Sequence, residues 1–87
     1  MVTTLLHFTA TGADAVCVPH RRAVAAAADA LGGWTVWEVD IDAAPETAHA
    51  YAVLNVPAVT VEGRLGEAPL VGAQSTEALV RRFRSSG

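Results

Sequence analysis

The sequence predicts one α/β domain whose strands and helices follow the order βαβαββα. Short runs rich in apolar and β-branched residues alternate with segments of helical composition, the pattern of a sheet covered by helices. The 87 residues, 52 % of them apolar, suffice for one hydrophobic core and leave no room for a second, so we expect residues 1–87 to form a single domain. The expected strands are residues 3–9, 34–41, 58–62 and 70–73, and the expected helices are residues 19–31, 45–53 and 76–84.

The first half of the chain predicts a parallel pair of strands. Residues 3–9 (Thr-Thr-Leu-Leu-His-Phe-Thr) have the composition of a strand, and residues 11–16 are expected to form a loop. Alanine propensity predicts a helix over residues 19–31, which Gly32-Gly33 ends. Because this helix joins the first strand to the second, at residues 34–41, the two strands run parallel with a right-handed crossover.

The second half predicts a short helix, a hairpin and a closing helix. Pro45 lies in the first turn of the helix at 45–53, where proline is tolerated. The last two strands are close enough in sequence to pair as a hairpin, which completes a mixed four-stranded sheet with helices on both faces. Ser75 or Thr76 is expected to cap the last helix. The last turns of that helix carry three arginines, Arg81, Arg82 and Arg84.

Composition narrows the classes of function. The net charge is −3, with six arginines and no lysine, which disfavours nucleic-acid binding. No apolar run approaches the ~20 residues of a membrane span. Residues 1–6 lack the features of a signal peptide, so we expect a cytoplasmic protein that does not contact a membrane. Cys17 is the single cysteine, which excludes an internal disulfide and a multi-cysteine zinc site, and we expect no metal.

The most informative segment is Val56-Pro57, at the start of the strand expected over residues 58–62. Proline gives up a backbone donor, so it belongs at the first residue of a strand or on an edge. The X–Pro amide also makes a cis bond accessible. A cis bond here would leave the backbone polar groups of Val56 free to pair with an extended partner by strand addition.

Three stretches of this sequence, together with the order of its elements, resemble a thioredoxin or glutaredoxin domain. The stretches are Phe8-Thr9-Ala10, Val39-Asp40-Ile41-Asp42 with the Pro-Glu helix that follows, and Asn55-Val56-Pro57 leading to Leu70-Val71-Gly72-Ala73. The resemblance covers nearly the whole chain. Only the first strand and helix of full-length thioredoxins have no counterpart in it. It implies a thioredoxin-like three-layer α/β/α fold. It also implies a groove that docks a peptide or thiol substrate, formed by Val56, Pro57, Gly72 and Ala73.

The family exchanges thiols and disulfides through a Cys-x-x-Cys pair at the start of its first helix, and two alignments of this chain compete there. In the first, Cys17-Val18-Pro19-His20 occupies the motif. Cys17 is then the nucleophile and His20 replaces the resolving cysteine, so a second thiol must resolve the mixed disulfide. Pro19, which belongs in the first turn of a helix, favours this alignment.

The second alignment has no gaps, because the spacing from Phe8 to Asp42 and on to Pro57 equals that of ordinary thioredoxins. Residues 13–16 (Ala-Asp-Ala-Val) then occupy the motif and Cys17 lies one residue beyond it. In that alignment the fold has lost its redox centre.

Under either alignment, His7 and Glu38 match the buried acid and the neighbouring lysine of the family, with the order of charges inverted. A buried Glu–His pair shifts the pKa values of both partners. Such a pair would let His7 relay protons near neutral pH. The alternative is a structural pair, in which the polar groups of the two side chains serve only as each other's partners in the core.

The sequence therefore predicts a monothiol thiol–disulfide oxidoreductase, with Cys17, His20, His7 and Glu38 as catalytic residues. We expect a monomer that acts on a protein or peptide thiol or disulfide. It would need no cofactor except a low-molecular-weight thiol such as glutathione. The alternative is a redox-inactive binding module of the same fold. A transferase that activates a small thiol is a third reading, which the length disfavours because there is no second domain for a co-substrate.

Overall fold

The computed structural model describes residues 3–85 and has the predicted order of elements. The strands are β1 (Thr4–Thr9), β2 (Thr35–Asp40), β3 (Ala58–Val61) and β4 (Leu70–Val71). The helices are α1 (Asp14–Ala30), α2 (Pro45–Ala50) and α3 (Thr76–Arg84). Within residues 3–85, no helix has both the length and the apolar character needed to cross a membrane.

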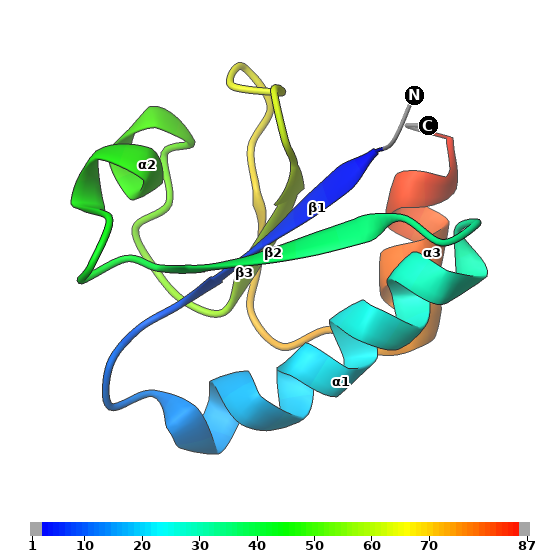
Figure 1. The fold of residues 1–87 in the computed structure, drawn as a ribbon, viewed down its shortest axis with the longest axis horizontal. Coiled ribbons are helices and arrows are strands. Elements are labelled where there is room, and N and C mark those ends of the chain that lie inside the picture. Colours follow the sequence, from blue (N-terminus) through cyan, green and yellow to red (C-terminus); the bar gives the residue numbers. More distant parts are fainter. Residues whose placement is uncertain (1–2, 86–87) are drawn as a thin grey trace.

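The four strands form one mixed sheet in the order β2-β1-β3-β4. β1 and β2 run parallel, as their helical connection requires, and β1 pairs with β3 and β3 with β4 in antiparallel fashion. α1 and α3 lie together on one face of the sheet, whereas α2 lies on the other (Figure 1). The predicted mixed four-stranded sheet with helices on both faces is confirmed.

Each face of the sheet carries its own hydrophobic core, because successive side chains of a strand point to opposite faces. Leu5 of β1 packs toward α1 and α3, whereas Leu6 and Phe8 pack toward α2. The first core consists of Leu5, Val24, Ala27, Ala28, Val59, Val61, Leu79 and Phe83. The second consists of Leu6, Phe8, Ala48, Tyr51, Val53 and Ala58.

The prediction was wrong about the start of the first helix. α1 begins at Asp14 rather than near Pro19, so residues 14–16 are helical instead of forming a loop. Asp14 places a negative charge in the first turn, where the helix dipole favours it. Pro19 lacks the N–H that would bond to the Ala15 carbonyl, and this local cost is outweighed by the burial of Cys17 and His20 against the sheet.

Other element ends differ less from expectation. Ser75 caps α3, because its hydroxyl accepts a hydrogen bond from the Ala78 N–H at 3.1 Å. Gly33, with φ +80°, ends the turn after α1 by donating its N–H to the Ala28 carbonyl at 3.1 Å. α2 and β4 are shorter than predicted and end at Ala50 and Val71.

Candidate functional site

The candidate binding groove lies where β3 begins and β4 ends. The Val56–Pro57 peptide bond is cis, and Pro57 is buried directly before the first residue of β3. The Gly72 N–H donates to the Pro57 carbonyl at 2.8 Å, which joins the two segments. Gly72 has φ +96°, a conformation that disfavours any residue with a side chain. The contact between Gly72 and Pro57 brings together the two segments predicted to form the groove, Val56-Pro57 and Gly72-Ala73.

Val56 offers main-chain hydrogen-bonding groups to a partner. It is half-buried and lies outside the ladders that pair β3 with its neighbours. In the described part of the chain, neither its N–H nor its C=O has a backbone partner. The rim of the groove is apolar, since Leu54 is 87 % exposed and Val71 is 47 % exposed.

The groove continues onto α1 through a pocket of about 340 Å³. Ala73 and Gln74 form one side of it and α1 forms the other. The α1 residues that line it are Ala15, Val16, Pro19, His20 and Ala23. Sequence reasoning missed Val16 and Gln74, because their place beside the groove depends on where α1 begins.

His7 and His20 form a buried imidazole pair between β1 and α1. Their relative exposures are 0 % and 3 %, and His7 Nε2 lies 3.0 Å from His20 Nδ1. Sequence reasoning assigned both residues to a site but did not pair them. One signal was present: His20, Val24 and Ala27 follow a helical period and share the buried face of α1.

Glu38 connects this pair to the surface. His7 Nδ1 lies 3.7 Å from Glu38 Oε2, as their opposed positions in the parallel ladder allow. Arg21 binds the same carboxylate with two donors: Nη2 donates to Oε1 at 2.7 Å, and Nε donates to Oε2. Arg21 was not predicted, because its contact with Glu38 depends on how α1 is positioned over β2.

The electrostatics around His7 and His20 favour neutral imidazoles beside an ionised Glu38 carboxylate. Burial, together with the neighbouring His20, lowers the pKa of His7 to about 4, even though Glu38 opposes the shift. Burial also lowers the pKa of His20. The hydrogen bond from Arg21 holds the pKa of Glu38 below its usual value. His7 therefore does not titrate near neutral pH, unlike the relay that the sequence suggested.

Cys17 lines a different hollow from the groove. Its side chain is 1 % exposed and borders a space of about 310 Å³ on the β2 side of α1. That hollow also contains Arg21, Glu38 and Asp40. The hydrogen bonds that the Asp40 carboxylate accepts from the Asp42 N–H and from Thr11 lower its pKa. Within residues 3–85, no three His, Cys, Asp or Glu side chains are arranged so that they could hold a metal ion.

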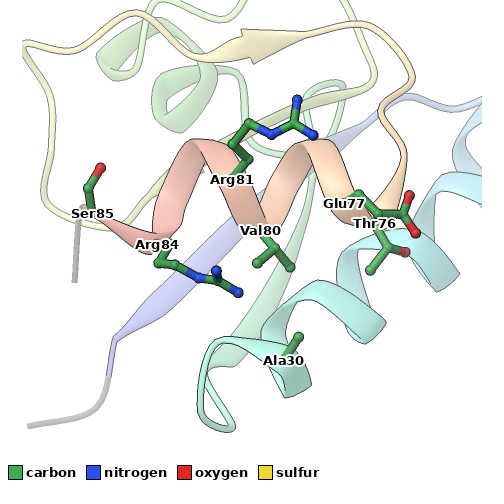
Figure 2. Close-up of a pocket in the computed structure, with 7 residues that line it drawn as sticks. All are labelled: Ala30, Thr76, Glu77, Val80, Arg81, Arg84 and Ser85. Carbon is green, nitrogen blue, oxygen red and sulfur yellow. The ribbon is translucent and has the colours of Figure 1, made fainter.

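Another hollow lies between the C-terminal end of α1 and α3, at the opposite end of α1 from the groove (Figure 2). Its volume is about 540 Å³. Figure 2 shows that Val80 and Arg84 extend toward α1, whereas Arg81 extends away from it. This hollow is lined by Ala30, Thr76, Glu77, Val80, Arg81, Arg84 and Ser85. Its lining contains neither a thiol nor an imidazole.

The structure is similar to solved thioredoxins over nearly its whole length. It matches a mutant thioredoxin from Halobacterium salinarum with a TM-score of 0.77 and 27 % identity, over 95 % of this chain and 73 % of that one. The chain has the thioredoxin fold. Thioredoxin from Fasciola hepatica matches this fold with a TM-score of 0.71 and 22 % identity, over 98 % and 80 % of the two chains. Oxidised thioredoxin from Plasmodium falciparum matches with a TM-score of 0.71 and 15 % identity, over 94 % and 81 %.

No protein-family model and no curated protein matches this thioredoxin-fold chain. The start of α1 is where the resemblance places the Cys-x-x-Cys motif, and Ala13 is the residue that precedes the first turn. The first helical residues are thus those that the alignment without gaps places in the motif, whereas the other alignment places Cys17 there. Cys17 is the fourth residue of α1, at the end of its first turn, and is buried.

Proposed function

We propose that this chain is a thioredoxin-fold binding module that docks an extended peptide segment at Val56-Pro57 and exchanges no disulfide there. The observation that carries the proposal is that the Val56 N–H and C=O have no backbone partner within residues 3–85. An extended segment that pairs with this N–H and C=O gains main-chain hydrogen bonds, which supply affinity with little dependence on sequence.

The apolar rim supports docking of side chains beside that main chain. Leu54 and Val71 flank the segment, and Val16 on α1 is 48 % exposed. Exposed apolar side chains gathered around a main-chain docking point are typical of interaction surfaces. We therefore expect the docked segment to carry apolar side chains at alternate positions, because successive residues of an extended chain face opposite ways.

The chemistry at the start of α1 supports a module without redox activity. A nucleophilic thiol needs exposure and a position where its thiolate is stabilised. The residues at the helix start beside the groove are Ala13, Asp14, Ala15 and Val16, and they bring no sulfur. The one thiol of the chain, at Cys17, is buried and lines a separate hollow.

Selection of peptides tests this function. Random peptides displayed on phage are selected on the immobilised full chain, and the Kd of each enriched peptide is measured by fluorescence anisotropy. We expect Leu54→Asp to weaken binding at least tenfold. Leu65→Asp is the matched control, because Leu65 is also exposed and apolar but lies in the turn at the far end of β3. Failure to enrich any peptide, or equal loss in both variants, would contradict the proposal.

A second candidate keeps thiol chemistry at Cys17, and one observation favours it: Arg21 lines the same hollow as the thiol. A cation there would stabilise a thiolate. The thiolate would attack one sulfur of a protein or peptide disulfide, forming a mixed disulfide and expelling the other sulfur as thiolate. A glutathione-type thiol would then attack the mixed disulfide and release Cys17. Disulfide reduction by the chain plus glutathione, lost in Cys17→Ala, would support this candidate, and no rate above background would exclude it.

A further inference from the structure

β2 is an edge strand whose outward main-chain groups have no partner within residues 3–85. It pairs with β1 on one side, and no strand of the described chain lies on its other side. The N–H groups of Thr35 and Ile41 donate toward β1, at 3.0 and 2.9 Å. Because alternate residues of a strand direct their main-chain groups to opposite sides, Val36 and Glu38 direct theirs outward, and neither has a backbone partner there.

The sequence of β2 lacks the usual devices that keep an exposed edge from pairing. The strand is six residues long and contains neither proline nor lysine. Its two charged side chains already have partners within the chain: Arg21 binds Glu38, and the Thr11 hydroxyl donates to Asp40 at 3.0 Å. Trp37, in the middle of the strand, is 59 % exposed. This edge is therefore open to another strand.

A second copy of β2 fits the edge in an antiparallel register related by a twofold axis. With Val36 opposite Glu38 of the second copy, the outward main-chain groups of both residues meet, and each such pair exchanges two hydrogen bonds. Trp37 then lies opposite Trp37 of the second copy as the non-hydrogen-bonded pair, in which side chains approach most closely. Aromatic pairs at such positions stabilise a sheet.

The neighbouring registers are less favourable. A shift of the second copy in one direction places Glu38 directly opposite Glu38 of that copy, and opposed like charges destabilise a sheet. A shift in the other direction places Glu38 opposite Trp34, which lies outside β2. The register centred on Trp37 is therefore the one in which the outward groups of both strands pair without charge repulsion.

A hollow beside Trp37 adds apolar surface to this edge. Its volume is about 500 Å³, and its apolar lining includes Leu6, Val39, Ala44 and Tyr51 on the α2 side of the sheet. A twofold axis perpendicular to the sheet keeps the α2 sides of both copies on one face. Trp37 of the second copy then lies against the indole that borders this hollow. Apolar surface next to an unpaired edge is typical of an interaction site.

We propose that two copies of this chain associate through antiparallel pairing of β2, with Trp37 of each copy at the twofold axis. Association ends at two copies, because the other edge strand, β4, has only two residues. The groove at Val56 remains free, because it lies before β3, and β1 separates β3 from β2. The proposed dimer differs from the monomer that the sequence suggested.

Sedimentation equilibrium of the full chain at several concentrations measures this association. We expect a mass twice that of one chain at high concentration. Trp37→Lys should raise the Kd for dimerisation at least tenfold, because it places two positive charges opposite each other. Leu65→Lys is the matched control, since Leu65 is also exposed and apolar but lies in the turn between β3 and β4. A monomer at millimolar concentration, or equal effects of the two substitutions in folded variants, would overturn the proposal.

An introduced disulfide tests the register. In a Cys17→Ala background, Trp37→Cys should oxidise to a covalent dimer, because residues of a non-hydrogen-bonded pair lie within reach of a disulfide. Thr35→Cys should not, because Thr35 lies opposite Val39 of the second copy. Equal cross-linking of both variants, or of Thr35→Cys alone, would overturn the proposal. Leu54→Asp, which weakens peptide docking, should leave the dimer intact, so failure here is distinct from failure of the groove.

Discussion

His7 of β1 and His20 of α1 share a hydrogen bond of 3.0 Å between ring nitrogens, inside the core and beneath the start of the groove. A hydrogen bond between two imidazoles needs an acceptor nitrogen, so at least one of the two rings must be neutral. Their ring centroids lie 4.9 Å apart, so protonating both would place two positive charges in contact within a buried space. The pair therefore joins helix to sheet best when both imidazoles are neutral.

Stability should fall as the pH is lowered from about 6.5 to about 4. The unfolded chain takes up a proton at His7 near pH 6.5, whereas folded His7 does so only near its pKa of about 4. Across this window the unfolded state binds more protons and is favoured. The difference between the two pKa values corresponds to about 3 kcal/mol from His7, and the lowered pKa of His20 acts in the same direction.

Urea unfolding at several pH values measures this effect. His7→Gln keeps an acceptor for His20 but takes up no proton, so it should reduce the dependence between pH 4 and 6.5 and leave the part that His20 contributes. His49→Gln is the control, because it removes an exposed imidazole on α2 that lies outside the His7–His20 pair. A wild-type stability that is constant over this range would show that the imidazoles are not held neutral.

Glu38→Gln should lower the pKa of His7 further. The negative charge of Glu38 favours protonated His7, and the substitution removes that charge while keeping the size of the side chain. The His7 ring resonance in an NMR titration should move to a lower midpoint. Glu46→Gln, on the opposite face of the sheet, should not change that midpoint. An unchanged midpoint in Glu38→Gln would mean that the 3.7 Å approach has no electrostatic effect.

Alkylation of Cys17 by iodoacetamide should be slow in the folded protein and fast after unfolding. The thiol is buried, so the reagent reaches it only when the structure opens locally. Mass spectrometry gives both rates, and we expect them to differ by at least a hundredfold. Rapid modification of the folded chain with a midpoint below about pH 8.5, the usual pKa of a free cysteine, would instead favour the oxidoreductase. Arg21→Ala should then slow the reaction.

Ser75→Ala should lower the free energy of unfolding by about 1 kcal/mol. The Ser75 hydroxyl accepts from the Ala78 N–H at 3.1 Å, and alanine leaves that donor at the helix start without its partner. Chemical unfolding measures the loss. Ser85→Ala, at the other end of α3, is the matched control and should have a smaller effect. Equal losses in the two variants would argue against the cap as the cause.

Local sequence signals sufficed for most of the fold. Pro57 located the start of β3 because proline restricts where a ladder can begin. The start of α1 was mispredicted because Pro19 was weighed by its local preference alone. Burial of one helix face against the sheet overrides that preference, and propensity does not report burial.

The candidate site was predictable only in part for the same reason. The segments around Val56 and Gly72 are recognisable along the chain, so the groove could be drawn from sequence. The pairing of His7 with His20 depends on the rotation of α1 over β1. The helical period of His20, Val24 and Ala27 indicates that His20 shares the buried face of α1, but it does not indicate which strand residue His20 meets there.

Hydrogen exchange at the Val56 amide distinguishes main-chain docking without thiol chemistry from binding that depends on Cys17. The amide is followed by NMR with and without a peptide enriched on the full chain, in the wild type and in Cys17→Ala. We expect the peptide to slow exchange at Val56 at least tenfold in both proteins and to bind both with the same Kd. Unchanged exchange at Val56 with the peptide bound, or loss of binding in folded Cys17→Ala, would contradict it.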